Sequence, residues 1–413
     1  MAKSLLLAAN GFSYNGNGAT SYVLFGNAGM PGSDTTEVNR KQIIRTAGTV
    51  SNLCVKITAN AHTVASTFKI RKGGVDGNSA ASITASTTGY FKDSTHSDSF
   101  SAGDHIGYAL FNGAGSSGSI TVSGASCIYE VTSGAFEKYV VANKTITFAT
   151  ASVTRYGPIV ETVTVNIFND TTEPSIQTDI QAAGVWSGLQ AYVSANTRTA
   201  TTIRSRVNSA NGNQVLSIGA SGTGFFEDTT NTDTLAVGDN INLSLTSGTG
   251  TNTLTMRFLS SEFVSTGDLA YGLNGASQNT NAPNSYYFSL GGDYQTTTES
   301  DVAMEIQQAM VVSMLNAIVT FNTQGGANTF GLRKNGANGN SLCSVPINTT
   351  GEFVDTSNTD SLVAGDIVNH VWTINGSAGG SLLVTSPGYL MDFDVPAVTV
   401  VSTHSTLLFM GVG

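Results

Sequence analysis

Nine aspartates fall into three groups, and the spacing within each group is the same. Carboxylates five and six residues apart are plausible Ca²⁺ ligands, because hard cations take oxygen donors from loops. The alternative is turn chemistry, in which Asp accepts local backbone N–H bonds and nearby glycines supply a positive φ. We favour this structural role, since a fold needs its turns in every copy and a binding site does not. The nine residues are Asp93, Asp98, Asp104, Asp228, Asp233, Asp239, Asp355, Asp360 and Asp366.

The aspartates belong to a longer motif that begins with an arginine. A Gly-Asn pair follows six residues later, and a Phe stands two residues before the first Asp of each group. We expect the Phe to point into a core and the Arg to pair with one of the motif's carboxylates. The motif residues are Arg71, Gly77, Asn78 and Phe91; Arg206, Gly212, Asn213 and Phe226; and Arg333, Gly339, Asn340 and Phe353.

A second signature, Thr-Thr-Glu, precedes the motif in each copy. It ends at Glu37, Glu173 and Glu299, each sixteen residues before a Leu. The copies are offset by about 135 and then 127 residues, which is far longer than a solenoid repeat. The chain is therefore a tandem triplication of whole domains.

The repeat predicts the domain organisation. No Pro-rich or charged linker separates the copies, so we expect the domains to pack closely in a row. The predicted parts are an N-terminal extension (1–18), three β-sandwich repeats (19–134, 135–265 and 266–395) and a C-terminal strand segment (396–413).

Within a copy, short runs alternate apolar and polar residues between Gly and Asn turns. Residues 67–71 and 119–123 are examples. This period of two is typical of strands with one buried face. About eight such runs per copy predict an all-β chain of three tandem jelly-roll or β-sandwich domains of about 130 residues. Residues 301–314 look helical by propensity, but their equivalents at 38–50 and 174–185 contain Gly and β-branched residues, so we predict a strand pair there.

The composition gives little support to catalysis. Only 11% of the residues are charged, well below the usual share in a globular domain. The five His are at unmatched positions, and no nucleophile elbow, phosphate loop or dinucleotide fingerprint occurs. We therefore predict no enzyme, no catalytic residues and no cofactor, although a pair of glycosidase carboxylates stays open.

The three cysteines, Cys54, Cys127 and Cys343, occupy no repeated position. Disulfides are therefore not the organising device, and free buried thiols are expected.

Charge changes along the chain. Residues 1–134 hold 9 Lys and Arg against 7 Asp and Glu, residues 135–265 hold 7 against 10, and residues 266–413 hold 2 against 11. The net charge of −10 and the lack of a basic patch argue against nucleic acid as a partner. The basic end could dock on a scaffold, or it could meet the acidic end of the next subunit in a head-to-tail fibre.

The two ends of the chain are apolar. The stretch 5–9 is too short for the core of a signal peptide, and no run reaches the length of a membrane span, so we expect cytoplasmic synthesis without a leader and no membrane. Segments 5–9 and 407–410 could add strands to an adjacent subunit or a scaffold. Alternatively, they pair with each other or with their own domains.

The runs 333–340, 351–360 and 364–366 resemble virion proteins of tailed phages, which look like trimer-forming jelly rolls of the C1q and tumour-necrosis-factor type. The resemblance implies a capsid-decoration, head-fibre or tail-associated protein of the virion, with itself and other virion proteins as partners. Three alternatives remain: a self-polymerising extracellular filament, a module that binds a host-surface glycan, and a virus capsid shell built from tandem jelly rolls.

Overall fold

The structure is a computed structural model that describes residues 2–14, 18–26, 34–113, 115, 118–147, 153–160, 168, 171–248, 253–273, 278–280, 283–291, 295–376 and 380–393. Its strands form six antiparallel sheets, two in each of three consecutive units. The predicted all-β fold of three tandem jelly-roll sandwiches is confirmed.

Unit 1 pairs a sheet of order β1-β9-β4-β7 with a sheet of order β2-β8-β5-β6, and β3 extends the second sheet along β8. Its elements are β1 (Ala2–Tyr14), β2 (Thr20–Val23), the 3₁₀ helix η1 (Glu37–Asn39), β3 (Gln42–Ile43), β4 (Gly48–Asn60), β5 (Ser66–Lys72), β6 (Val75–Ile83), β7 (Gly89–Phe100), β8 (His105–Phe111) and β9 (Ile120–Val131).

Unit 2 repeats this plan with sheets β10-β19-β13-β16 and β11-β18-β14-β15, to which β17 and β12 are added. Its elements are β10 (Phe136–Thr147), β11 (Thr154–Gly157), the 3₁₀ helix η2 (Glu173–Ile176), β12 (Thr178–Asp179), β13 (Gly184–Asn196), β14 (Thr201–Val207), β15 (Ala210–Ile218), β16 (Gly224–Glu227), β17 (Asp233–Leu235), β18 (Asn240–Ser247) and β19 (Thr253–Ser265).

Unit 3 has sheets β20-β31-β25-β28 and β23-β22-β30-β26-β27, with β21, β29 and β24 added at their ends. Its elements are β20 (Leu269–Leu273), β21 (Gln278–Thr280), β22 (Asn284–Phe288), β23 (Gln295–Thr296), α1 (Glu299–Val302), β24 (Met304–Glu305), β25 (Met310–Asn322), β26 (Asn328–Lys334), β27 (Ala337–Val345), β28 (Gly351–Asp355), β29 (Asp360–Leu362), β30 (Ile367–Ile374) and β31 (Leu382–Asp392).

The segment with helical propensity in the third copy is mostly extended. Only the single turn α1 is helical there, and it is followed by β24 and the start of β25. The equivalent turns η1 and η2 in the other units are 3₁₀ helices. The predicted strand pair is thus correct after the first turn, because pairing with β30 and β31 outweighs local propensity.

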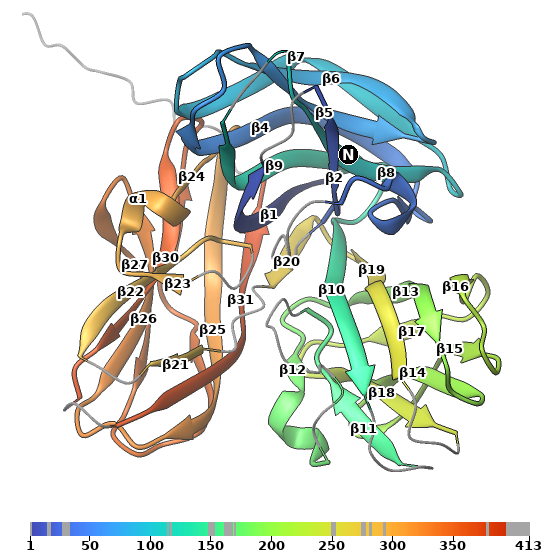
Figure 1. The fold of residues 1–413 in the computed structure, drawn as a ribbon. Helices are drawn as coiled ribbons and strands as arrows, with labels where there is room; N and C mark the ends of the chain where they lie inside the picture. The colour runs from blue at the N-terminus through green and yellow to red at the C-terminus, as the bar shows by residue number, and fades with distance from the viewer. Residues whose placement is uncertain are drawn as a thin grey trace, which may run out of the picture.

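The three units form a closed ring, not the predicted row (Figure 1). Unit 3 returns to unit 1 through Lys56 and Tyr90, which both bond to the carbonyl of Ala303. The first strands of the units, β1, β10 and β20, contact one another pairwise at the centre. Each unit therefore touches both of the others, in an arrangement close to threefold symmetry.

The N-terminal segment is a strand of unit 1. We predicted an extension over 1–18, but β1 pairs antiparallel with β9 from Ala2 opposite Val131 to Tyr14 opposite Ile120. The expectation that 5–9 adds a strand to an adjacent subunit is thus wrong here, because the last strand of its own unit offers an open edge. The C-terminal segment 396–413 lies outside the described residues. Among the described residues, no helix is long and apolar enough to cross a membrane.

Each unit has one apolar core, and each core includes residues from a neighbouring unit. Phe136 of β10 packs into the core of unit 1, and Tyr271 of β20 packs into the core of unit 2. Ile128 of β9 packs into the core of unit 3. Full burial of such a side chain contributes about 1.5–3 kcal/mol, so the hydrophobic effect that folds each unit also closes the ring.

Candidate functional site: the repeated motif and the interfaces between units

The motif arginines pair with the Thr-Thr-Glu signature. Two nitrogens of each guanidinium contact the two carboxylate oxygens: 3.0 and 3.1 Å for Arg71 and Glu37, 2.7 and 2.7 Å for Arg206 and Glu173, and 2.8 and 2.9 Å for Arg333 and Glu299. We expected one of the motif aspartates as partner, and this is wrong. The two-pronged geometry suits carboxylate recognition and fixes orientation.

The same guanidinium also closes the hairpin that follows it. Arg333 donates to Asn338 Oδ1 at 2.6 Å and to the carbonyl of Gly336, and it lies 5.8 Å from the ring of Tyr287. The arginine thus ties together the helical turn α1, the strand β22 and the hairpin of unit 3. Equivalent contacts join Arg71 to Asp76, Gly74 and Tyr22, and Arg206 to Asn211, Ser209 and Tyr156.

The first two motif aspartates cap the edge strand of the sandwich. In unit 3, Asp360 accepts the N–H of Asn340 at 2.7 Å and the N–H of Ser341 at 2.9 Å, while Asp355 accepts the N–H of Leu342 at 2.7 Å. These three successive donors belong to β27, the outermost strand of its sheet. Two carboxylates from the opposite sheet thus occupy backbone donors that another chain could otherwise pair with.

The cap recurs in the other units. In unit 1, Asp98 and Asp93 accept the N–H groups of residues 78, 79 and 80 at 2.6, 2.9 and 2.8 Å. In unit 2, Asp233 and Asp228 accept those of residues 213 and 215 at 2.7 and 2.8 Å, while the intervening N–H of Gln214 bonds to Ser205 Oγ.

The repeated glycine of the Gly-Asn pair makes room for this cap. A Cβ built on Gly77 would lie 2.7 Å from Asp98 Oδ1, and one on Gly339 would lie 2.7 Å from Asp360 Oδ1. Real Cβ atoms do not approach this closely, so a side chain here would push the carboxylate off the edge strand. Because the aspartate cap recurs in each unit, the glycine that makes room for it recurs as well.

The first aspartate of each group also closes its own loop. Asp355 Oδ1 accepts the N–H groups of Ser357 and Asn358, both at 3.1 Å. Burial alone would raise the pKa of this carboxyl, but the N–H bonds hold it below its ordinary value. The pKa of Asp93 and of Asp228 is lowered in the same way.

The third aspartate of each group closes the turn before the next long strand. Asp104, Asp239 and Asp366 accept the N–H three residues earlier, at 2.8, 2.7 and 2.8 Å. The preceding glycines have φ of +97°, +88° and +96°, which favours Gly. All nine aspartates thus accept backbone N–H bonds, and Asp104 and Asp366 also pair with Lys72 and Lys334 at 3.2 and 3.0 Å. The described residues contain no group of three or more His, Cys, Asp or Glu placed to hold a metal ion. The calcium alternative for these aspartates stays untested.

The remaining motif residues have packing roles. Phe91, Phe226 and Phe353 are partly buried and pack against the core of their own unit. Asn78, Asn213 and Asn340 donate side-chain bonds to the carbonyls of residues 97, 232 and 359. The predicted free buried cysteines are confirmed, and burial raises the pKa of each thiol to about 12.

One repeated residue was missed by the motif search. Asn60, Asn196 and Asn322 end the long strands β4, β13 and β25, and each donates two bonds to carbonyls of the loop that leads to the motif Phe. Their offsets match those of the Thr-Thr-Glu signature at Glu37, Glu173 and Glu299, so a search for isolated repeated asparagines would have found them.

The interface between units 1 and 2, interface 1–2, begins with a reciprocal pair. Gln190 of β13 accepts the N–H of Ile43 at 2.9 Å and donates to the Ile43 carbonyl at 2.8 Å, in the manner of a strand. Beside it, the guanidinium of Arg45 forms a two-pronged salt bridge with Glu227 of β16.

A buried ion pair lies behind these contacts. Glu262 of β19 accepts the N–H groups of Arg45 and Thr46, both at 2.9 Å, and Lys138 of β10 at 3.0 Å. Lys138 also donates to the Ile43 carbonyl at 3.0 Å, and the Lys138 and Glu262 side chains are both fully buried. A buried charge is stable only when its hydrogen bonds are satisfied, and here Glu262 accepts from Lys138 and from a loop, while Lys138 also donates to the Ile43 carbonyl.

At interface 3–1, a segment of unit 3 docks on the surface of unit 1. Lys56 of β4 donates to the carbonyls of Ser300 and Ala303, the latter at 2.7 Å. Tyr90 of β7 donates to the same Ala303 carbonyl at 2.8 Å, and Lys92 forms a salt bridge with Glu305.

Interface 2–3 has the same geometry with different chemistry. Glu352 of β28 accepts Gln181 Nε2 and Asn316 Nδ2, both at 3.1 Å. Tyr271 donates its hydroxyl to the Asp179 carbonyl at 2.8 Å and accepts from Asn316 at 3.0 Å. No salt bridge joins units 2 and 3 within the described parts of the chain.

The three interfaces are cyclically equivalent. In each, the segment after the first turn of one unit docks on the sheet face beside the motif Phe of the next unit. The residues just before that Phe are Tyr90, Phe225 and Glu352, and all three lie at an interface. The difference in charge between the units therefore contributes to contacts within the molecule, where cations of unit 1 face acids of units 2 and 3.

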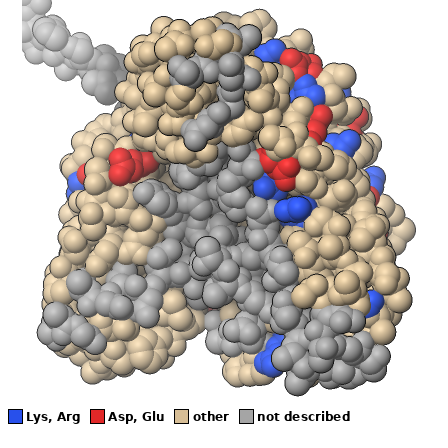
Figure 2. Space-filling view, in the orientation of Figure 1, with Lys and Arg blue, Asp and Glu red and all other residues tan. Residues whose placement is uncertain are grey.

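Figure 2 shows where charged side chains gather on one face. Lys and Arg alternate with Asp and Glu along unit 1 and its junction with unit 2, while most of the remaining described surface in this view is uncharged. Opposite charges thus lie side by side rather than in large patches of one sign.

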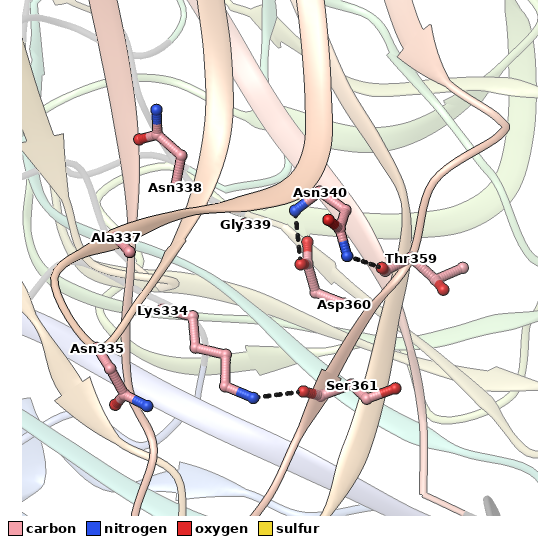
Figure 3. A pocket seen from close by; sticks show the side chains of 9 residues that line it. All are labelled: Lys334, Asn335, Ala337, Asn338, Gly339, Asn340, Thr359, Asp360 and Ser361. Atoms are coloured by element: carbon pink, nitrogen blue, oxygen red, sulfur yellow. Dashed lines mark hydrogen bonds between the residues drawn. The ribbon is translucent and has the colours of Figure 1, made fainter.

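A polar hollow lies on the outer corner of unit 3 (Figure 3). The backbone N–H of Asn340 donates to Asp360 Oδ1 at 2.7 Å across it, and Lys334 donates to the Ser361 carbonyl at 2.8 Å. It is lined by Lys334, Asn335, Ala337, Asn338, Gly339, Asn340, Thr359, Asp360 and Ser361.

Comparison with known proteins gives structural matches only. No protein-family model and no curated protein matches the chain. A structure described as the triple jelly roll fold and turret assembly of an archaeal virus matches at 13% identity and TM-score 0.17, covering 94% of this chain and 90% of the other. The structure of infectious bursal disease virus, Gx strain, matches at 7% identity and TM-score 0.19, covering 95% and 82%. TM-scores this low establish no relationship, so function is argued below from the chain's own geometry.

Proposed function

We propose that this chain is a non-enzymatic structural protein of a virus particle, which supplies a preassembled ring of three jelly rolls. The observation that carries the proposal is the cyclic use of one docking surface in three interfaces, closed by buried side chains. Such a ring presents three jelly-roll units around a centre, as a trimer does, but all three belong to a single chain. This supports the resemblance to trimer-forming jelly rolls of virions, here with the three units covalently linked.

Within that role, we infer attachment to a particle as a capsid-decoration or tail-associated protein. The repeated motif serves the fold of each unit, which leaves the outer faces free to vary between units. The proposed partners are further copies of this chain and other virion proteins, and the proposed location is the virion.

The test is imaging of the particle. Cryo-electron microscopy of virions from the source of this sequence, with mass spectrometry of their proteins, should find the chain at fixed stoichiometry as a three-lobed density. Absence of the chain from intact, purified virions would overturn the proposal.

Closure of the ring weighs against the filament alternative. A head-to-tail fibre would use the basic surface of unit 1 and the acidic surface of unit 3, but Lys92 and Glu305 already meet within one chain. Electron microscopy of the purified protein separates the two ideas, since long fibres would favour the filament and discrete particles the virion component.

A second candidate function rests on the hollow in unit 3. Its amide, hydroxyl, ammonium and carboxylate groups are the kinds of donor and acceptor that bind sugar hydroxyls. If unit 3 binds a host-surface glycan, the full chain should bind on a glycan array and Asn338→Ala should reduce that binding. An array without any bound glycan would remove this candidate and leave the structural role intact.

A further inference from the structure

The outer face of the second sheet differs between the units at one central position. Unit 1 has Lys69 there and unit 2 has Arg204, each two residues before the motif arginine, where unit 3 has Gly331. Lys69 reaches across its hairpin to Asp76 at 2.8 Å, and Arg204 donates to the carbonyl of Gly212 at 3.2 Å. Because glycine has no side chain, the equivalent part of unit 3 is not covered in this way.

An apolar row crosses this face of unit 3, on the side away from the ring centre (Figure 1). Gly331 of β26 pairs with Val371 of β30 and with Leu342 of β27, and Val371 pairs with Tyr287 of β22. The residues next to them along the strands pack in the core, so the row itself points outward. Leu342 is 44% exposed, which leaves its end of the row accessible. We call Tyr287, Gly331, Leu342 and Val371 the outer strip.

A row of hydroxyls borders the outer strip on one side. Thr329 of β26 pairs with Thr373 of β30 and with Ser344 of β27, and Thr373 pairs with Ser285 of β22. Each hydroxyl can both donate and accept a hydrogen bond and carries no charge.

The motif arginine borders the outer strip on the other side. The guanidinium of Arg333 lies 5.8 Å from the Tyr287 ring, and Glu299 balances its charge. Its partner across the hairpin, Asn338, also lines the polar hollow of unit 3. The outer strip is therefore continuous with the hollow.

We propose that the outer strip binds a neutral oligosaccharide, with the flat faces of its sugar rings on Tyr287, Gly331 and Leu342. A pyranose ring presents C–H groups on its faces and hydroxyls at its edges, and an apolar strip between polar rows offers partners for both. Gly331 opens the site and restricts it to unit 3. The inference rests on the second candidate function, glycan binding by unit 3, and adds the ligand class and the surface that receives it.

Charge favours a neutral ligand over an acidic one. The cation that units 1 and 2 carry at this position is absent from unit 3, where Gly331 stands. Residues 266–413 hold 2 Lys and Arg against 11 Asp and Glu, so this part of the chain repels anions.

A glycan array of short neutral oligosaccharides and their uronic-acid-containing analogues, probed with the full chain, is the first test. Binding is expected on neutral glycans alone. Binding to acidic glycans alone would overturn the inference, and no binding at all would remove the glycan function together with it.

Gly331→Lys then separates the outer strip from the hollow. It places the unit 1 residue in unit 3, and the atom closest to its Cβ is the flexible end of Leu342 at 3.0 Å, so the fold should be kept. The variant should lose binding to the neutral glycans that the wild type retains. Leu342→Lys, at the exposed end of the strip, should do the same and decides the matter if circular dichroism shows that Gly331→Lys is unfolded.

Lys69→Gly is the matched control, because it makes the reverse change at the equivalent position of unit 1, and it should leave binding unchanged. Binding kept by a folded Gly331→Lys or Leu342→Lys variant would overturn the inference. Loss of binding in Asn338→Ala but in neither strip variant would keep the glycan function and assign it to the hollow alone.

Discussion

In each unit, two aspartates accept backbone hydrogen bonds that a neighbouring strand would otherwise accept. A carboxylate has only acceptors, and two oxygens suffice for two successive backbone N–H groups, as Asp360 shows with residues 340 and 341. The Asp360 residue is 4% exposed, so its bonds are not exchanged with water. The cap therefore both joins the two sheets and covers an edge strand.

Removal of one cap should be costly. Asp360→Ala leaves two N–H groups without their acceptor, and we expect a loss of about 2–3 kcal/mol in the free energy of unfolding. Urea denaturation measures it. Asp268→Ala, at an exposed position, is the control and should change stability by less than about 0.5 kcal/mol. Equal effects of the two substitutions would refute the cap.

His370 makes the protein sensitive to acid. It is fully buried between Phe330 and Tyr389, and burial lowers its pKa to about 3. Because the unfolded chain takes up a proton near the ordinary value of 6.5 and the folded chain does not, stability falls with pH between about 6.5 and 3.

The variant His370→Leu should flatten this acid slope. The difference in unfolding free energy between the variant and the wild type should grow in the variant's favour by about 1 kcal/mol per pH unit below pH 6.5. Urea titrations at several pH values measure the difference. A difference that stays constant with pH would show that His370 does not titrate in this way.

The motif's structural role was predictable from its repetition, but its partners were not. Arg71 and Glu37 are separated by 34 residues, and the spacing between them is the same in unit 3 but one residue shorter in unit 2. Nothing in the sequence distinguishes Glu37 from Asp98 as the acid that the arginine meets. That choice depends on which loops the jelly roll brings together.

At the scale of elements, β10 joins units 1 and 2 most strongly. It contributes Phe136 to the core of unit 1 and Lys138 to the buried pair with Glu262. Phe136 and Lys138 lie on one face of the strand, while Tyr139 and Val141 on the other face pack in the core of unit 2, so the two faces of one strand serve two units.

Loss of the buried ammonium should leave Glu262 without its charge partner. Lys138→Met should lower the free energy of unfolding by about 3–5 kcal/mol, and adding Glu262→Gln should recover part of it. Lys69→Met breaks the exposed pair with Asp76 and should cost less than about 1 kcal/mol. Calorimetry or urea unfolding measures the change in the free energy of unfolding for these variants. A double variant no more stable than Lys138→Met would contradict the pairing.

Strands carrying the motif were predictable from alternation, whereas the first strand of each unit was not. The segment 2–14 has no motif residue and was assigned to an extension, yet it pairs with β9 over its length. The first strand of a unit is identified by its pairing with the last strand of that unit. Such long-range pairing leaves no local signal in the sequence.

At the scale of the molecule, charge distinguishes the three interfaces. Unit 1 presents Lys92 to unit 3 and Arg45 to unit 2, so both interfaces of unit 1 pair a base with an acid. The sequence displayed this difference as a gradient, but the ring could not be predicted because its closure depends on contacts such as Lys92 with Glu305, which are 213 residues apart.

Reversing one charge at interface 3–1 should weaken closure, and reversing both should restore it. Lys92→Glu and Glu305→Lys alone should each lower stability by about 1 kcal/mol, with the double variant close to the wild type. Thermal unfolding of the wild type, the two single variants and the double variant gives a double-mutant cycle. Additive losses in the double variant would mean that the two residues do not meet.

Zero-length carbodiimide cross-linking of the dilute wild-type chain tests ring closure most directly, because it joins a lysine to a carboxylate only where they touch. Mixing ¹⁴N- and ¹⁵N-labelled protein distinguishes links within one chain from links between chains. The Lys69–Asp76 pair within unit 1, at 2.8 Å, serves as the internal standard. We predict a Lys92–Glu305 link in single-isotope peptides from the monomeric band. Recovery of the standard with no Lys92–Glu305 link, or with that link only in mixed-isotope peptides, would contradict the ring.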